Sequence, residues 1–303
     1  LRESSAQLKH AAQSYCKAET PTADARKAVE AAWSAAFLDW QRVRFVDFGP
    51  IQQDSLAWQL QFWPDPKNLT GKKARGWLSG DRPISIDTLA ADSVAIKGFP
   101  AVEYLLFDPQ LQQQAQALPA VRACALLGAV TRQIDLNAER LAADWEQFRP
   151  HFLEQAHYAD ATVLAAMHAL ELMKDRRLGA PMGAAGKGRR NPYLADAWRS
   201  GLSLSAVEAS LLGLRELFLP GLAKRLQSPA GQQLYQRFST QLTHTFERLE
   251  QMPPGLAPLL NDADGYRQLQ LLLLDIERLD TQLSGSIAPE LGVVKGFNAS
   301  DGD

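Results

Sequence analysis

The sequence has little of what several large classes of protein require. It carries 32 Lys and Arg against 34 Asp and Glu, so it lacks the strong positive charge typical of nucleic-acid-binding proteins. No stretch approaches the roughly 18–20 consecutive apolar residues that a membrane-spanning helix needs. The apolar run at 271–274, for example, ends at Asp275. We therefore expect a folded chain that binds no nucleic acid and has no transmembrane segment.

β-branched residues are also scarce, because Val and Ile are few beside the many Leu and Ala. Leu and Ala favour helices, whereas strands are enriched in β-branched residues, so the composition predicts an all-α fold. Residues 66–85, rich in Gly, Lys and Arg, are expected to form an excursion at the molecular surface. Apolar residues recur at helical spacing in the remaining segments, and we expect the main helices near residues 2–19, 24–46, 119–148, 159–178, 203–219, 229–250 and 263–283.

The glycine-rich stretch at 179–192 is the strongest candidate for a linker, since it holds four glycines and the cations Lys187, Arg189 and Arg190. It would divide the chain into an N-terminal helical lobe over residues 1–180 and a C-terminal lobe over residues 181–303. The second lobe would end in a Gly-rich tail. The segment lengths on either side suit two helical bundles.

The chain has two cysteines, Cys16 and Cys124. Their wide spacing excludes a Cys-x-x-Cys zinc or redox motif. In a reducing compartment they would be two unrelated thiols. In an exported protein they could pair and close a loop of about 108 residues. The composition alone does not choose between these alternatives.

Residues that commonly perform catalysis are sparse. The five histidines form no His-Glu-x-x-His motif, and no Ser or Cys lies in a recognisable nucleophile motif. His168 and Glu171 stand three residues apart on a predicted helix, a spacing found in metal sites of helical bundles. The alternative is a partly buried structural pair.

Three segments place charged residues beside aromatic ones, at residues 40–50, 61–65 and 98–107. A buried ion needs partners, so this pattern is typical of a buried polar network or a binding pocket. The alternative is simple packing of two lobes with the charges at the surface.

These same segments resemble the imelysin family, the insulin-cleaving-peptidase-like and iron-regulated proteins of bacterial envelopes. Gly98 and Glu103, followed by Tyr-Leu-Leu-Phe, are similar to the family signature Gly-x-His-x-x-Glu. Residues 45–50 and 61–65 resemble upstream family segments, and residues 198–204 and 296–303 resemble downstream ones. One position departs from the signature, because Pro100 stands where the family has its histidine.

The resemblance implies an imelysin-like double helical bundle, with roughly four helices in each lobe and the signature near the lobe interface. It implies a protein of the periplasm or an outer-membrane lipoprotein, with a signal peptide removed ahead of Leu1, and a role in iron uptake. An envelope location favours a disulfide between Cys16 and Cys124.

The leading functional hypothesis is a non-enzymatic protein that binds a ligand or a metal between its lobes, in iron uptake or its regulation. Glu103 would be the central acid and Arg44 its charge partner. Trp63, with Gln61 beside it, would form an aromatic wall. Two carboxylates of the C-terminal tail, Asp301 and Asp303, would complete the group of ligand-binding residues.

Two further expectations accompany this hypothesis. The cofactor would be iron or another divalent metal, because oxygen-rich ligands suit hard cations, and an envelope protein could be a partner.

A rival hypothesis is a metallopeptidase, in which Glu103 is the general base and His168 and Glu171 hold the metal. The loss of the signature histidine at Pro100 counts against it, since a catalytic zinc needs about three protein ligands. The other rival is an interaction scaffold with no small ligand.

Overall fold

The computed structural model describes residues 1–184 and 188–294, and within these ranges the chain forms helices joined by turns, with no strand. The all-α prediction is confirmed. The helices that come first along the chain are α1 (Arg2–Lys17), α2 (Ala23–Val43), α3 (Leu56–Leu60), α4 (Leu69–Ser79), α5 (Ile86–Ala90), α6 (Gly98–Phe107) and α7 (Val121–Glu154). They are followed by α8 (His157–Leu172), α9 (Ala180–Met182), α10 (Ser203–Gly213), α11 (Leu219–Arg225), α12 (Pro229–Leu249), α13 (Ala257–Leu260), α14 (Ala263–Gln282) and α15 (Ala288–Glu290).

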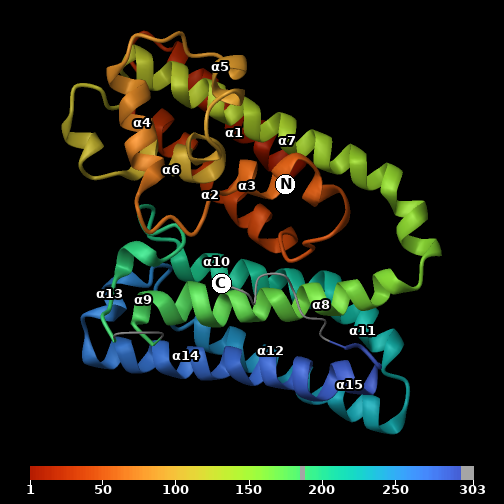
Figure 1. Cartoon of the computed structure of the whole chain (residues 1–303). Helices are drawn as coiled ribbons and strands as arrows, with labels where there is room; N and C mark the ends of the chain where they lie inside the picture. Colours follow the sequence, from red (N-terminus) through yellow and green to blue (C-terminus); the bar gives the residue numbers. More distant parts are fainter. Residues whose placement is uncertain (185–187, 295–303) are drawn as a thin grey trace.

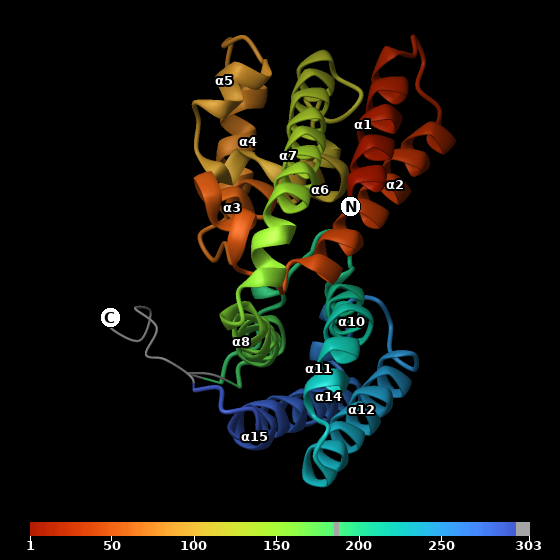
Figure 2. The same cartoon turned by 90° about the vertical axis from the view of Figure 1, so that its right-hand side faces the viewer.

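Two hydrophobic cores divide these helices into two lobes, one above the other in Figures 1 and 2. The first core draws most of its residues from the segment 8–141, and the second from the segment 163–293. Between them, α7 runs along the first lobe and its far end leads into α8 (Figure 1). The change of core thus comes at the turn between α7 and α8, ahead of the glycine-rich segment 179–192 where the sequence suggests a linker.

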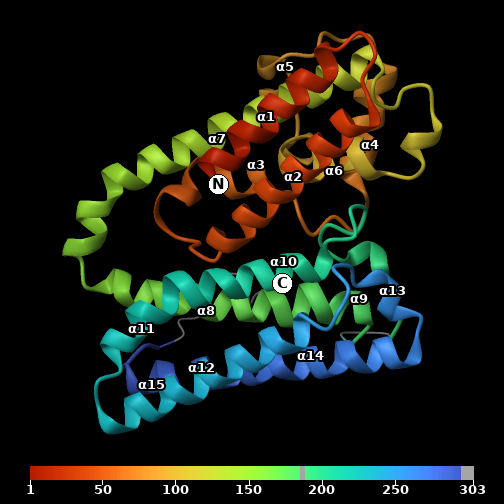
Figure 3. The same ribbon diagram turned by 180° about the vertical axis from the view of Figure 1, so that it is seen from behind.

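Helix α2 shows how the sequence specifies the first lobe. The side chain of Thr22 accepts a hydrogen bond from the backbone N–H of Ala25, 3.1 Å away, and so caps the first turn. Trp33, Phe37 and Trp40 follow at helical spacing and are buried in the first core. Helix α2 also lies against α10 of the second lobe. Figure 3 shows α8 and α10 on the side of the second lobe that faces the first.

Residues 66–85 are not a mere excursion at the surface, because this segment contains the packed helix α4. The side chain of Asn68 accepts a hydrogen bond from the backbone N–H of Gly71 (3.1 Å) and starts the helix. Ala74, Trp77 and Leu78 then form a buried stripe, while the lysines of α4 face solvent. An apolar pattern of only three residues is difficult to recognise in the sequence, because charged residues stand between them.

A disulfide joins Cys16, at the end of α1, to Cys124, near the start of α7. The S–S distance is 2.08 Å and the two Cα atoms lie 5.5 Å apart. The bond links the first helix of the first lobe to the last helix of that lobe.

Within residues 1–184 and 188–294, no helix is both long and apolar enough to cross a membrane.

Candidate functional site

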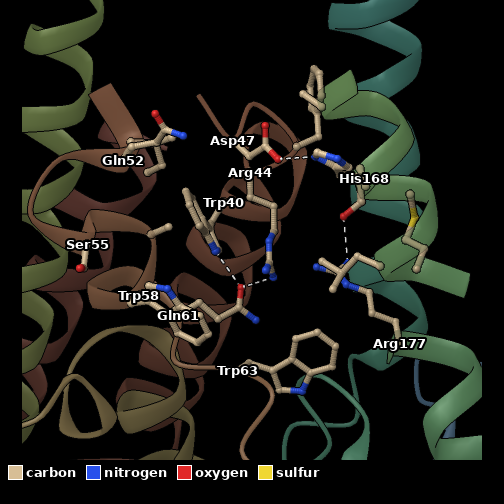
Figure 4. Close-up of a pocket in the computed structure, with 18 residues that line it drawn as sticks. Trp40, Arg44, Asp47, Gln52, Ser55, Trp58, Gln61, Trp63, His168 and Arg177 are labelled. Carbon is tan, nitrogen blue, oxygen red and sulfur yellow. Dashed lines mark hydrogen bonds and ion pairs between the residues drawn. The ribbon is translucent and has the colours of Figure 1, made fainter. Parts of the chain in front are cut away.

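The side chain of Gln61 lies at the centre of a hydrogen-bond network between the lobes (Figure 4). Its Oε1 accepts hydrogen bonds from Trp40 Nε1 (2.7 Å), Gln41 Nε2 (2.9 Å) and Arg44 Nη1 (2.7 Å). Its Nε2 donates to Asp196 Oδ1 across the interface, at 2.7 Å. The amide thus accepts from three residues of the first lobe and donates to a carboxylate that follows α9, so it links the two lobes.

Arg177 approaches the same network from the second lobe. It lies in a π-helical turn that continues α8, and only 2% of its side chain is exposed. Its Nη1 donates to the carbonyl oxygen of Ala206 and to Ser210 Oγ, each 2.9 Å away, and its Nη2 donates to Gln41 Oε1. Its Nη2 also lies 3.4 Å from Asp196 Oδ2. Its Nε, although buried, has no hydrogen-bond partner among the described residues.

Two guanidinium groups therefore share one buried carboxylate. Arg44 Nη1 lies 3.9 Å from Asp196 Oδ2, the same oxygen that pairs with Arg177. Burial lowers the pKa of Arg44 to about 9, and the positive charge of Arg177 acts in the same direction while Asp196 opposes both. Burial also lowers the pKa of Arg177, and the negative charge of Asp196 opposes this shift. Two basic side chains thus share a single acidic one.

A cavity of about 450 Å³ opens beside this network, and we call it the cationic pocket. Residues of both lobes line it, from α2, α3 and the loops around them on one side and from α8 and α10 on the other. Its charged wall holds Arg44 and Arg177, and Figure 4 shows Trp63 below them. His168 and Asp47, also in the lining, face each other with Nδ1 and Oδ2 3.0 Å apart. The rest of the lining is largely apolar and includes Trp40, Phe45, Ile51, Trp58, Ala165, Ala169, Leu172 and Met173.

A second cavity, of about 560 Å³, shares Trp63 with the first, and we call it the acidic pocket. Four carboxylates line it, together with one guanidinium, that of Arg199. The four acidic residues are Asp65, Glu103, Asp108 and Asp196. Arg199 Nε donates to Asp108 Oδ2 at 2.8 Å, so that one of these carboxylates is paired. The two cavities that meet at Trp63 thus carry opposite charge.

Glu103 presents its carboxylate to the acidic pocket from α6. It is buried, and its Oε1 accepts hydrogen bonds from the backbone N–H and the hydroxyl of Ser200, both at 2.9 Å. Burial raises the pKa of Glu103 to about 6, although the bonds from Ser200 and the charge of Arg199 act against the rise. Pro100 lines the same pocket from the first turn of α6, where proline is compatible with a helix.

Gly98 allows α6 to begin close to the segment that carries Gln61. Its φ of +71° lies in the left-handed region. A Cβ atom at this position would fall 2.1 Å from the carbonyl oxygen of Leu60. Only glycine therefore fits, and the signature glycine brings Glu103 and Gln61 to the same interface.

The structure brings together some of the residues singled out in the sequence and separates others. Arg44, Gln61 and Trp63 meet at the cationic pocket, whereas Glu103 lies in the acidic one. Arg44 is not the charge partner of Glu103, because its guanidinium pairs with Asp196. The tail carboxylates Asp301 and Asp303 lie outside the described residues.

The described residues do not fit a catalytic metal site. Within residues 1–184 and 188–294, no group of three or more His, Cys, Asp or Glu side chains is placed to hold a metal ion. A catalytic zinc needs about three protein ligands. His168 and Glu171 both lie on α8, and His168 pairs with Asp47. We therefore derive no metal-dependent step from His168, Glu171 or Glu103.

Two central residues, Arg177 and Asp196, were missed by the sequence reasoning. Arg177 follows Leu170 and Met173 at helical spacing, which places a cation on the apolar side of its helix. Asp196 stands between Ala195 and Ala197, an acid within a short apolar segment. Both patterns signal a buried charge, but neither identifies the partner.

Comparison with known proteins places this arrangement in a family. The family model described as imelysin, peptidase M75, matches residues 1–283. An imelysin-like protein from Psychrobacter arcticum 273-4 has a similar structure, with a TM-score of 0.86 and 21% identity over 98% of this chain and 91% of that one. A putative iron-regulated protein A precursor from Parabacteroides distasonis ATCC 8503 is also similar, with a TM-score of 0.70 and 14% identity over 96% of this chain and 89% of that one. No curated protein sequence matches this chain.

Proposed function

This chain belongs to the imelysin family, and we propose that it is a non-enzymatic protein of the bacterial envelope that holds a small ligand between its two lobes. Its biological role would be in iron acquisition or its regulation. One observation carries the proposal, namely that the lobes meet around a cavity whose wall is charged, buried and incompletely paired.

The cost of burying incompletely paired charges in that wall favours a ligand-binding site over a network that only holds the two lobes together. Buried ions are costly unless they are paired and hydrogen-bonded. At the cationic pocket two arginines share Asp196, and one buried N–H of Arg177 has no partner among the described residues. A cavity of about 450 Å³ is within the range of small-molecule sites. A bound ligand could supply the missing partner.

Two observations support the envelope and the link to iron. The disulfide between Cys16 and Cys124 is of a kind that persists in oxidising compartments such as the periplasm. The solved structure from Parabacteroides distasonis is described as an iron-regulated protein A precursor. The metallopeptidase hypothesis has no comparable support, because the described residues hold no set of three metal ligands.

Native mass spectrometry of the protein, purified gently from its host, tests ligand binding even though the ligand is unidentified. We expect one small molecule per chain, released when the chain is unfolded. Trp58→Ala, at the mouth of the cationic pocket, should lower this occupancy. Leu274→Ala should not, since Leu274 is similarly exposed (46% against 47% for Trp58) but lies on α14, away from both pockets. A chain that carries no small molecule contradicts the proposal.

The role in iron acquisition is tested in the host. A strain that lacks the gene should grow more slowly than its parent when iron is chelated, and equally well when iron is replete. The wild-type chain should restore growth and Trp58→Ala should restore less. Equal growth of deletion and parent strains under iron limitation would contradict the role in iron acquisition. It would not affect the proposal of ligand binding, which the mass spectra test separately.

A further inference from the structure

The cationic pocket has a charge imbalance that its own residues do not correct. The titratable groups in its lining are Arg44, Arg177, His168 and Asp47, and Asp196 lies behind the two guanidiniums. Asp47 faces His168 at 3.0 Å, and its side chain is half exposed. The partly buried Arg44 and the buried Arg177 thus share one carboxylate, that of Asp196, and a second anionic group would give each guanidinium a partner of its own.

The same wall presents hydrogen-bond donors that lack acceptors. Arg44 makes its bonds to Gln61 and Gln41 and its ion pair with Asp196 through Nη1. This leaves its Nε and Nη2 without a hydrogen bond to any described residue. Arg177 adds its buried Nε, which has no hydrogen-bond partner among the described residues, and the neighbouring acceptor Asp196 Oδ2 likewise has none. A guanidinium presents its N–H groups in a planar fork that matches the two oxygens of a carboxylate.

The remaining walls suit a flat apolar group. Trp40, Trp58 and Trp63 line the cavity, together with aliphatic side chains from α8. Figure 4 shows the guanidinium of Arg44 between Trp40 and the guanidinium of Arg177, with Trp63 below both arginines. Aromatic side chains pack well against a planar ring. A ligand with a charged head and an aromatic body would therefore satisfy both the donors and the apolar walls.

We infer that the cationic pocket selects small organic anions in which a carboxylate is attached to a flat apolar body. This inference rests on the proposed function and names the chemical class of its ligand. The carboxylate lies between Arg44 and Arg177, and the apolar body lies against the tryptophans. The acidic pocket on the other side of Trp63 has the opposite charge and does not take this ligand.

Three probes of one shape and different charge test the inference. Benzoate, benzamide and benzylamine are each titrated into the full chain, and binding is followed by calorimetry and by the fluorescence of the tryptophans in the pocket. We expect benzoate to bind at least tenfold more tightly than benzamide, and benzylamine to bind more weakly still. Preference for benzamide or benzylamine, or equal affinity for all three, overturns the inference and leaves ligand binding between the lobes intact.

Variants then locate the binding site. Arg44→Gln should weaken benzoate binding at least tenfold and should narrow its advantage over benzamide. The matched control is Arg140→Gln, which removes a guanidinium that pairs with the exposed Asp54 and should leave benzoate affinity unchanged. Trp58→Ala, an exposed position that should tolerate substitution, should weaken benzoate and benzamide alike. Benzoate binding that neither Arg44→Gln nor Trp58→Ala alters would overturn the assignment to this pocket.

The outcomes separate this inference from the proposed function. If no probe binds while native mass spectrometry still finds a small molecule on the chain, the anionic class is wrong and the binding function stands. If the mass spectra also show an empty chain, both are overturned.

Discussion

Gly213 of α10 lies directly on the backbone of Arg42 in α2. A Cβ atom on Gly213 would fall 1.9 Å from the carbonyl oxygen of Arg42, a distance that no real side chain tolerates. One turn earlier on α10, Ser210 Oγ donates to the carbonyl oxygen of Gln41 at 3.2 Å. The close approach of the two helices therefore positions the polar network between the lobes.

Gly213→Ala should destabilise the protein, because the added methyl group forces the two lobes apart. Overpacking of this kind costs about 1–3 kcal/mol, and denaturant unfolding would measure it. Gly128→Ala is the control, since Gly128 lies within α7 with open space around it. That change should stabilise the chain by about 0.5–1 kcal/mol through helix propensity. Equal effects of the two substitutions would show that the close approach is unimportant.

Asp196→Asn should be strongly destabilising, because it leaves the buried Arg177 and the partly buried Arg44 without their carboxylate. Removal of one partner from a buried ion pair typically costs about 3–5 kcal/mol. The matched control is Asp54→Asn, which breaks an Asp–Arg pair whose aspartate is 70% exposed and should cost less than about 1 kcal/mol. Urea unfolding of both variants makes the comparison, and similar small losses would mean that Asp196 does not balance the two arginines.

Removal of the disulfide should lower the stability of the first lobe. Cys16 and Cys124 are 108 residues apart, and the chain-entropy estimate for a loop of this length is about 4–5 kcal/mol. The double variant Cys16→Ser with Cys124→Ser should melt at a lower temperature than the wild type. Its melting should be insensitive to reductant, whereas reductant should lower that of the wild type. No effect of reductant on the wild type would contradict the bond.

Glu103 should make stability depend on pH in the weakly acidic range. Its pKa is about 6 in the folded protein against an ordinary value of 4.5, with burial as the main cause. The folded state therefore holds the proton more tightly than the unfolded state. The stabilisation is fully present below pH 4.5 and is lost as the pH rises through 6, by about 2 kcal/mol in total.

Glu103→Gln tests this dependence, because glutamine resembles the protonated acid and does not titrate. Unfolding free energies would be measured for both proteins between pH 4 and 7.5. We expect the wild type to lose stability relative to the variant from pH 4.5 through 6, and the difference to become constant above about pH 7. Parallel profiles, or a change in the opposite direction, would refute the shifted pKa.

Part of the candidate site could be predicted because its residues are close in sequence. Arg44, Gln61 and Trp63 lie within about twenty residues of one another, in segments where charge stands beside aromatic residues. The expected pairing of Arg44 with Glu103 was wrong because the actual partner of Arg44 is distant in the sequence. The partner of Arg44 is Asp196, far along the chain, and only the docking of the second lobe brings it within 3.9 Å.

The sequence by itself determined the helical class, most of the long helices and the family, because helix propensity, apolar periodicity and short motifs are local properties. Only the tertiary structure decided that α8 belongs to the second core and that residues 66–85 contain a packed helix. It also decided that Trp63 lies between two cavities of opposite charge. Such features depend on which surfaces meet when the lobes fold. Burial and pairing of charges are set by distant residues, and no local pattern records their distances.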